Sequence, residues 1–326
     1  MMNMITPQQT FAESITKAAS KQTYYTIRFL VDRERVADAF NAYAYFRWVD
    51  DTLDADSALS GRPQRKALWP EVEAQERITF LTRQKSLLKK CWRGESVQDA
   101  TLEEQMLIEL VKHNQEKNSG LQSYLRNMMQ VMEFDAERRG RLISQAELNE
   151  YTRWLATAVT EAMHYFLGPD SYSPHNETRY LAVMAAHITH MLRDTFDDVQ
   201  AGYYNIPREV LETNHIQPYD IESRAYRAWV RSRVWLARHY FNVGREYLAR
   251  VEEPRCRLAG FAYTARFEWL LDTIEREGYC LRPQYNERKR LSTGLRMGLS
   301  TLSALINVRK PETLRQPVVS QLLRKP

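Results

Sequence analysis

Two segments that lie far apart in the chain each contain a pair of aspartates four residues apart. Asp50 and Asp54 form the first pair, and Asp194 and Asp198 form the second. On a helix, residues four apart lie one turn from each other on the same face, so each pair predicts two neighbouring carboxylates. Apolar residues precede both pairs. Carboxylates that lose hydration near a core repel each other, which is unfavourable unless a cation lies between them.

A magnesium ion is the cation that these carboxylates predict. Mg²⁺ takes oxygen ligands, keeps several waters, and is typically held by one or two carboxylates together with phosphate oxygens of a substrate. Arg47 and Arg193 precede the two pairs closely, and their guanidinium groups can share the charge of a leaving diphosphate in bidentate geometry. Two facing aspartate pairs therefore predict a clamp for a diphosphate, whose departure would leave a carbocation.

These features also have an ordinary structural interpretation. A single aspartate pair at this spacing is common on solvated helix faces, so the hypothesis of a site depends on two pairs occurring in the same context. Aromatic residues along the chain fit either a plain core or an apolar tunnel that binds a prenyl chain and stabilises its cations. These aromatic residues are Tyr43, Tyr45, Phe46, Tyr151, Trp154 and Phe166.

The elements that must position these side chains are predicted to be helices throughout. Apolar residues recur mostly at helical spacing, and the alternation typical of strands is scarce. Helices that are apolar on most sides belong inside a bundle, and no segment is long enough to be an interdomain linker, so one all-α domain is expected. The expected helices are 8–20, 23–30, 33–55, 69–92, 102–118, 121–137, 145–166, 176–200, 219–249, 256–277 and 287–308.

Composition indicates the class of protein but does not identify its partner. The chain of 326 residues is 44% hydrophobic and 27% charged, which is typical of globular proteins. Its net charge of +5 suits a polyanionic substrate or an anionic membrane surface, whereas basic residues scattered beside acidic ones give nucleic-acid binding little support. Three dispersed cysteines predict neither a disulfide framework nor a zinc site. Without a visible signal peptide or membrane-spanning run, we expect a cytoplasmic protein, with peripheral contact to a membrane left open.

At these residues the chain resembles the squalene/phytoene synthase family. Three segments follow the order and spacing of that family: 20–25, 42–54 with the first aspartate pair, and 191–207 with the second. Residues 132–135 and 151–168 resemble its central helices, and Gly278-Tyr279 resembles the end of its late helix. The resemblance covers about 20–291, and the combination is specific although each motif alone is weak.

The resemblance implies a fold and a reaction. The expected fold is the isoprenoid synthase α fold, a single helical domain over 1–326 with a central cavity and both aspartate pairs at its mouth. Members of the family join two prenyl diphosphates head to head. The resemblance therefore implies an allylic substrate, farnesyl or geranylgeranyl diphosphate, with Mg²⁺ as the cofactor.

The resemblance also implies roles for individual residues. Arg47 and Arg193 correspond to partners of the diphosphate, and Ser20 and Lys21 to an N-terminal segment that contacts it. Together with the two arginines, the expected catalytic residues are Tyr43 and Tyr151, which match cavity tyrosines near the reacting carbons. The expected metal ligands are Asp50, Asp54, Asp194, Asp198 and His190.

Several positions depart from the family pattern. His187 and His190 stand where Gln and Asn are usual, and a histidine nitrogen matches Mg²⁺ less well than an oxygen. Thr157 and Thr160 replace two glycines, which is expected to narrow the cavity. The loop 201–207, which includes Asn205, lacks a basic Arg-Gly-Arg element and the tyrosine that follows it, so a diphosphate contact and a catalytic tyrosine are expected to be missing. Glu268 stands where tyrosine is common.

Two alternatives to the condensation remain open. The same machinery could ionise one prenyl diphosphate and cyclise it, a terpene-cyclase-like reaction that the two threonines and the altered loop favour. A noncatalytic member of the family could instead serve as an assembly or interaction protein. The four aspartates and two arginines argue against that alternative, because clustered carboxylates without compensation bring nothing to a passive bundle.

Overall fold

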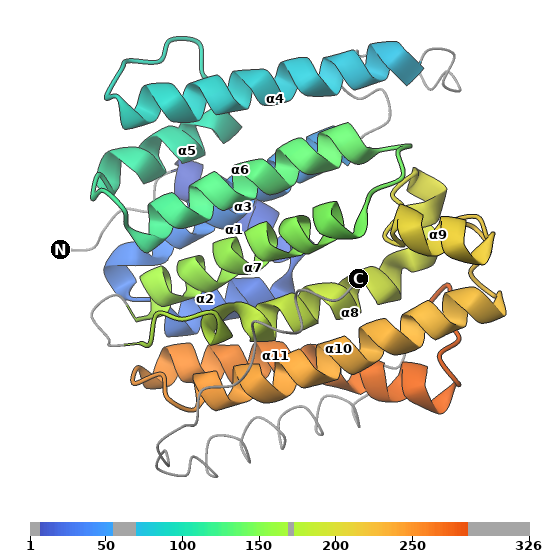
Figure 1. Ribbon diagram of the computed structural model, residues 1–326. Coiled ribbons are helices and arrows are strands. Elements are labelled where there is room, and N and C mark those ends of the chain that lie inside the picture. The colour runs from blue at the N-terminus through green and yellow to red at the C-terminus, as the bar shows by residue number, and fades with distance from the viewer. Residues whose placement is uncertain (1–6, 55–69, 169–172, 286–326) are drawn as a thin grey trace.

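The computed structural model describes residues 7–54, 70–168 and 173–285. Over these ranges the chain forms helices and no strands, which confirms the all-α prediction (Figure 1). The helices are α1 Pro7–Ala19, α2 Lys21–Leu30, the short 3-10 helix η1 Arg33–Arg35, α3 Val36–Asp54, α4 Pro70–Trp92, α5 Leu102–His113, α6 Gly120–Arg138, α7 Gln145–Leu167, α8 Thr178–Ala201, α9 Arg208–Asn214, α10 Arg224–Leu248 and α11 Pro254–Arg276.

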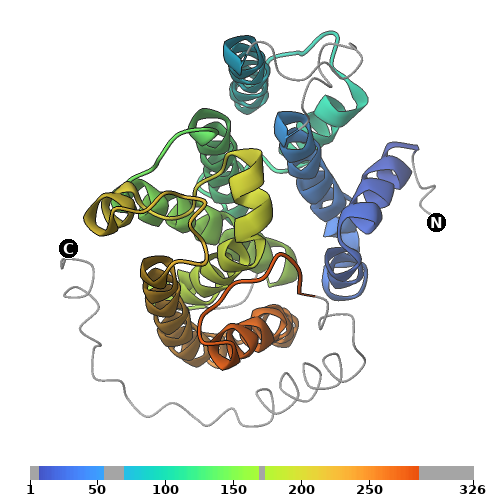
Figure 2. The same cartoon turned by 90° about the vertical axis from the view of Figure 1, so that its right-hand side faces the viewer.

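The long helices lie side by side with roughly parallel axes, as the end-on view shows (Figure 2). The two most extensive helix pairs are α8 with α10 and α6 with α7, and α7 also packs against α8. Helices α1 and α5 pack against α3, while α4 covers α6 and α5 from the outside. Helices α6 and α8 end at the right-hand end of Figure 1, where α7 and α10 begin.

Two loops at this end are tied to each other by backbone hydrogen bonds. The amide of Gly140, after α6, donates to the carbonyl of Gly202, after α8, at 2.8 Å. The amide of Arg208 donates to the carbonyl of Ile143 at 2.8 Å. The start of α7 is set in turn by a capping box, in which Ser144 and Glu147 each accept a backbone hydrogen bond from the other. The ends of α6 and α8 are therefore held in a fixed relation to each other.

Some helix boundaries differ from the sequence-based expectation. Helix α5 ends at His113 rather than near 118, because the Asn114 side chain donates to the Leu110 carbonyl and to Asp38. Helix α10 begins at Arg224 rather than near 219, because the Ser223 hydroxyl caps it. The short helix α9 was not expected at all. The helix expected at 287–308 lies outside the described residues.

The cysteines and the apolar character of the helices were also the subject of sequence-based expectations. Cys91, Cys256 and Cys280 are all unpaired, as expected. Among the described helices, none combines the length and the apolar character that a membrane span requires. The single-domain and cytoplasmic assignments stay predictions.

Candidate active site

Both aspartate pairs lie on helices and at the same end of the bundle. Asp50 and Asp54 occupy the last turns of α3, and Asp194 and Asp198 lie in the last two turns of α8. The i, i+4 spacing therefore places each pair on one face of a helix, as predicted. The two pairs are then joined by hydrogen bonds and one cation–π contact through residues that sequence analysis did not predict.

Arg138, at the end of α6, is the centre of this connection. It is buried, its Nε donates to Oδ1 of Asp135 at 2.6 Å, and its Nη1 donates to Oδ1 of Asn205 at 2.9 Å. Nδ2 of Asn205 in turn donates to Oδ2 of Asp198 at 2.7 Å. The second aspartate pair is therefore fixed to α6 through the amide of Asn205.

Tyr203 makes the connection to the first pair. Its hydroxyl donates to Oδ1 of Asp54 at 3.1 Å, and its ring centroid lies 4.9 Å from the guanidinium carbon of Arg138. The loop 201–207 thus places Tyr203 at the first aspartate pair, while the absence of the family's catalytic tyrosine stays a prediction. The basic element that the family usually has in this loop is absent here. Arg138 of α6 brings a guanidinium close to Tyr203 of the loop instead.

Tyr151 lies beside this network on α7. Its hydroxyl donates to Oδ2 of Asp135 at 2.9 Å, and the Arg138 guanidinium lies 4.7 Å from its ring centroid. Burial raises the pKa of Tyr151 well above its ordinary value, and the charge of Asp135 raises it further. Tyr151 therefore keeps its proton and holds a fixed orientation next to the aspartates.

Burial raises the pKa of three of the four aspartates, Asp50, Asp54 and Asp198. Burial raises the pKa of Asp50 to about 7, and the charges of Asp54 and Asp135 add to the effect. Burial likewise raises the pKa of Asp198 to about 7, with Asp194 as the next cause. A carboxyl group with such a pKa is half protonated near neutral pH, so a cation bound nearby would be strongly favoured.

Asp194 is compensated instead. Arg193 donates to both of its oxygens, at 2.6 and 2.7 Å, and Nε2 of His190 lies 3.1 Å from Oδ2. Burial acts to raise the pKa of Asp194, but the hydrogen bonds from His190 and Arg193 outweigh it and hold this pKa well below its ordinary value. Because Nε2 of His190 already faces Asp194, the expected metal ligand has only its other ring nitrogen left for a metal.

Arg47 lies at the first pair, as predicted, but it contacts Asp50 and Asp51 rather than Asp54. Its Nη1 donates to Oδ2 of Asp50 at 3.2 Å, and its Nε donates to Oδ2 of Asp51 at 3.1 Å. The arginine side chain is 41% exposed. It is therefore accessible to an anion that approaches from outside the bundle.

The N-terminal segment reaches the same region through Tyr43. Ser20 is the N-cap of α2, where its hydroxyl accepts from the amide of Thr23 at 3.2 Å, and Lys21 is exposed in the first turn. Burial raises the pKa of Tyr43, while Arg47 and hydrogen bonding by Thr23 and Ser20 lower it. Ser20 and Arg47 therefore both lie near Tyr43, although the hydroxyl of Ser20 already has a structural role as a cap.

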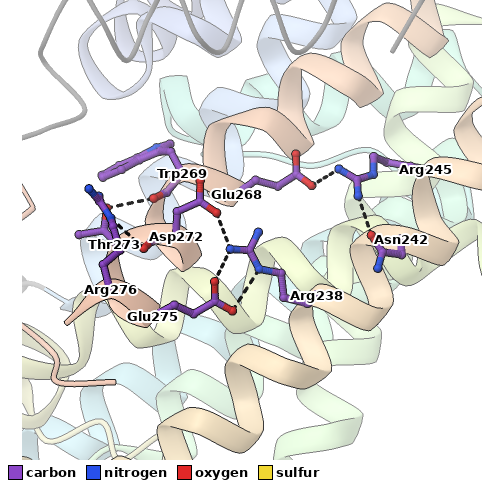
Figure 3. Close-up of polar contacts among 9 residues, drawn as sticks. All are labelled: Arg238, Asn242, Arg245, Glu268, Trp269, Asp272, Thr273, Glu275 and Arg276. Atoms are coloured by element: carbon purple, nitrogen blue, oxygen red, sulfur yellow. Dashed lines mark hydrogen bonds and ion pairs between the residues drawn. The ribbon is translucent and has the colours of Figure 1, made fainter. Parts of the chain in front are cut away.

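The positions that depart from the family pattern do not share one environment. Thr160 and His187 are buried, and within the described part of the chain neither the threonine hydroxyl nor the imidazole nitrogens have a hydrogen-bond partner. Glu268 faces α10, where it forms an ion pair with Arg245 (Figure 3). The charge of Glu268 is thus compensated between α10 and α11, and it adds no acid to the aspartate network.

The donor set fits Mg²⁺ held jointly by protein and substrate. Within the described ranges, no three His, Cys, Asp or Glu side chains converge closely enough to hold a metal ion by themselves. Mg²⁺ usually needs only one or two carboxylates when phosphate oxygens complete its ligands. The carboxylates of the two pairs supply oxygen donors at one end of the bundle, and the raised pKa values of Asp50 and Asp198 agree with this fit.

Sequence reasoning missed four residues of this site: Asp135, Arg138, Tyr203 and Asn205. Asp135 and Arg138 lie three apart on a helix, which is a visible spacing but an ordinary one. Tyr203 and Asn205 lie in a loop, where no periodicity indicates what a side chain contacts. Their roles depend on the two loop-to-loop hydrogen bonds that bring the ends of α6 and α8 together.

Comparisons with known proteins agree with the fold and with the family resemblance. The family model described as squalene/phytoene synthase matches residues 16–294. The squalene synthase HpnC from Alicyclobacillus acidocaldarius superposes with a TM-score of 0.62 at 16% identity, over 84% of this chain and 95% of that chain. A dehydrosqualene synthase solved with a ligand has a TM-score of 0.63 at 16% identity, over 91% of this chain and 95% of that chain. No curated protein matches the chain.

Proposed function

Because the chain belongs to the squalene/phytoene synthase family, we propose that it ionises allylic prenyl diphosphates and joins two of them head to head. The proposed substrate is farnesyl or geranylgeranyl diphosphate. The single observation that carries the proposal is the network from Asp54 through Tyr203, Arg138 and Asn205 to Asp198, which brings both aspartate pairs to one place.

The aspartates Asp50, Asp54, Asp194 and Asp198 would hold Mg²⁺ together with the substrate. When bound, Mg²⁺ would supply positive charge that neutralises the leaving diphosphate. Arg47 is exposed enough to bind diphosphate oxygens, and Arg193 offers a second guanidinium on the opposite helix. Tyr43 and Tyr151 keep their protons because burial raises the pKa of each, so they present neutral rings to an allylic cation.

The experiment that tests the proposal is turnover of defined substrates. Purified protein is incubated with farnesyl or geranylgeranyl diphosphate, with Mg²⁺ or with EDTA, and released diphosphate and the mass of each product are measured. We expect Mg²⁺-dependent release of diphosphate and a product that contains two prenyl groups. Absence of release from either substrate with Mg²⁺ present contradicts the proposal.

A matched pair of variants links this activity to the site. Asp198→Asn removes a charge from the network, whereas Asp197→Asn makes the same change at the exposed neighbouring position. We expect kcat/KM to fall by roughly a hundredfold or more in Asp198→Asn, which corresponds to about 2.7 kcal/mol of transition-state stabilisation. In Asp197→Asn it should stay within about threefold of wild type. Equal loss in both variants would separate the activity from this network.

A terpene-cyclase-like reaction of one prenyl diphosphate is the second candidate. It is favoured by Thr160, which is buried in α7 at a position where the family usually has glycine, so less room is left for a second substrate. The same incubation separates the two, because cyclisation gives products with a single prenyl group. If the protein binds neither substrate in the presence of Mg²⁺, the noncatalytic alternative is supported instead.

A further inference from the structure

Tyr25 and Phe29 of α2 form an exposed aromatic pair on the surface of the bundle. The two residues are 51% and 73% exposed, and their rings stack with centroids 6.0 Å apart and planes 10° from parallel. Single exposed apolar side chains are ordinary on a protein surface. Among the exposed aromatic residues that the structure describes, however, these two are the only ones whose rings meet.

The pair lies on an outer face of α2 that also carries cations. At 3.6 residues per turn, Lys21, Tyr25, Arg28 and Phe29 fall within about 100° of arc, and all four are exposed. Ile27, on the other side of the helix, is buried. The outer face of a surface helix is ordinarily polar, with charges of both signs. This face of α2 instead combines two aromatic rings with positive charge only.

The positive charge extends beyond the helix at both ends. Lys17 is exposed just before α2, and its Nζ lies 5.3 Å from the centroid of the Tyr24 ring. Arg33 is exposed just after the helix. Together with Lys21 and Arg28, these residues place four cations around the aromatic pair.

The neighbouring acids leave this charge largely uncompensated. Helix α2 contains no acidic residue. Glu13 of α1 accepts a hydrogen bond from the Tyr24 hydroxyl at 3.0 Å, and Asp32 pairs with Arg255 of α11 at 2.5 Å. Glu34 is the exposed acid closest along the chain. The surface around α2 is therefore positive and suits an anionic partner.

The size of the aromatic pair favours a lipid surface over a protein. From the area of an aromatic side chain, the pair offers about 250 Å² to a partner. A stable protein interface buries about 800 Å² on each side, so the pair falls well short of it. A lipid surface needs less, because aromatic rings insert at the level of the headgroups while each lysine or arginine adds attraction to anionic lipid.

We propose that the outer face of α2 docks on an anionic lipid membrane, with the rings of Tyr25 and Phe29 among the headgroups and Arg28 and Arg33 against lipid phosphates. The use of such docking rests on the proposed function, because joining two prenyl groups with loss of diphosphate leaves a wholly apolar product. Helix α2 packs against α3, which carries the first aspartate pair. The docking face and the candidate active site therefore belong to neighbouring helices.

The test is sedimentation of the full chain with vesicles, in EDTA and without substrate. Vesicles of phosphatidylcholine alone are compared with vesicles of phosphatidylcholine and phosphatidylglycerol in equal parts. We expect wild type to bind the anionic vesicles at least tenfold more tightly, and to lose most of this preference at about 1 M salt, where charges are screened within about 3 Å.

Two double variants separate the rings from the charges. The variant with Tyr25→Ser and Phe29→Ser should bind anionic vesicles at least tenfold more weakly than wild type. The variant with Arg28→Gln and Arg33→Gln should lose about tenfold on anionic vesicles and nothing on phosphatidylcholine. These positions are exposed, so the Tm of each variant should stay within about 2 °C of wild type.

Matched controls lie on α10, on a different side of the bundle from the N-terminal helices (Figure 2). Trp235→Ser removes an aromatic residue that is 66% exposed, and Arg224→Gln with Arg227→Gln removes the same charge as the α2 variant. Both controls should bind vesicles as wild type does. Equal binding by wild type and both α2 variants, a loss in the α10 controls instead, or no binding of wild type to anionic vesicles overturns the proposal.

Sedimentation velocity without lipid tests the other occupant of this face. A dimer of wild type that the variant with Tyr25→Ser and Phe29→Ser dissociates would make the face a contact between copies and would overturn membrane docking. Vesicle binding requires neither Mg²⁺ nor substrate. Docking therefore stands if no product forms, and it falls if products form while vesicle binding is independent of Tyr25 and Phe29.

Discussion

Asp194 and Asp198 lie one turn apart on α8, yet their carboxyl groups behave oppositely. Asp194 receives two hydrogen bonds from Arg193 and lies beside His190, and its pKa is held well below the ordinary value. Asp198 receives one hydrogen bond from a neutral amide, and burial raises its pKa to about 7. The charge of Asp194 is therefore already compensated by its neighbours, whereas Asp198 is suited to bind an added cation.

Tyr203 offers a direct test at this scale. Tyr203→Phe removes the hydrogen bond to Asp54 and leaves the ring near Arg138. We expect kcat/KM for the prenyl diphosphate to fall about tenfold, while the free energy of unfolding changes by only about 1 kcal/mol. Steady-state kinetics and urea unfolding measure the two effects. Tyr204→Phe, at the adjacent half-buried tyrosine, is the control and should change neither.

Arg138 should matter for stability as well as for the site. Arg138→Met leaves Asp135 without its cationic partner and Oδ1 of Asn205 without a donor. We expect the free energy of unfolding to fall by about 3 kcal/mol, measured by urea denaturation. Arg141→Met breaks the exposed ion pair with Glu147 and should cost less than about 1 kcal/mol. A loss in Arg138→Met no larger than in this control would contradict the central role of Arg138.

At the scale of elements, helix α10 is held by a close contact with α8 and by ion pairs with α11. A Cβ at Gly244 would lie 2.6 Å from the backbone nitrogen of Ala182, which is closer than real Cβ atoms come. On another face of α10, Arg238 pairs with Asp272 and Glu275, and Arg245 pairs with Glu268 (Figure 3). Helix α10 is thus fixed between two neighbours.

Gly244→Ala tests the helix contact. The added methyl group meets backbone atoms of Ala182 rather than the end of a flexible side chain, so α8 or α10 must shift. We expect a loss of about 2 kcal/mol in the free energy of unfolding, despite the better helix propensity of alanine. Ser232→Ala at an exposed position of α10 should change this free energy by less than about 0.5 kcal/mol. A stabilised Gly244→Ala protein would contradict the contact.

At the scale of the whole molecule, the two ends of the bundle use buried polar groups differently. Away from the aspartates, Arg179 binds Glu161 in bidentate fashion, at 2.8 and 3.1 Å, and also donates to the hydroxyl of Tyr247 at 3.1 Å. That hydroxyl lies 3.2 Å from Nε2 of His164. This network joins α7, α8 and α10 with its charges balanced. The network at the aspartate end joins α3, α6 and α8 and has more negative charge than its arginines compensate. Only this end is therefore suited to bind an added cation.

An ion pair between Arg83 of α4 and Glu104 of α5 makes the free energy of unfolding depend on pH. Glu104 of α5 accepts hydrogen bonds from Arg83 at 2.6 and 2.7 Å and from Gln84 at 2.9 Å, and the bonds from Arg83 lower its pKa to about 2. A carboxyl group whose folded pKa is depressed stabilises the fold above its unfolded pKa, here 4.5, and this stability is lost as the pH falls toward 2.

In a difference between wild type and a variant, the contributions of the other titrating groups cancel. The gap in the free energy of unfolding between wild type and Glu104→Gln should be about 2 kcal/mol at neutral pH. It should narrow as the pH falls below 4.5. Urea unfolding over a pH series measures it, and the gap for the neutral control Gln105→Ala should stay constant. A gap for Glu104→Gln that is independent of pH would contradict the ion pair.

The sequence by itself determined the long helices of the described residues and the local geometry of the aspartates. Helical periodicity and breakers depend on neighbours a few residues apart, and Asp50 with Asp54 and Asp194 with Asp198 share faces for the same reason. The family resemblance was visible for a related reason, since its motifs are short and local.

Only the tertiary structure decided which groups compensate one another. Asp54 meets Tyr203, and Glu268 meets Arg245. Such contacts join residues far apart in the chain, and their charge balance depends on which helix faces which. No spacing within one segment encodes that, because it is set by packing between helices and by backbone bonds such as Gly140 to Gly202.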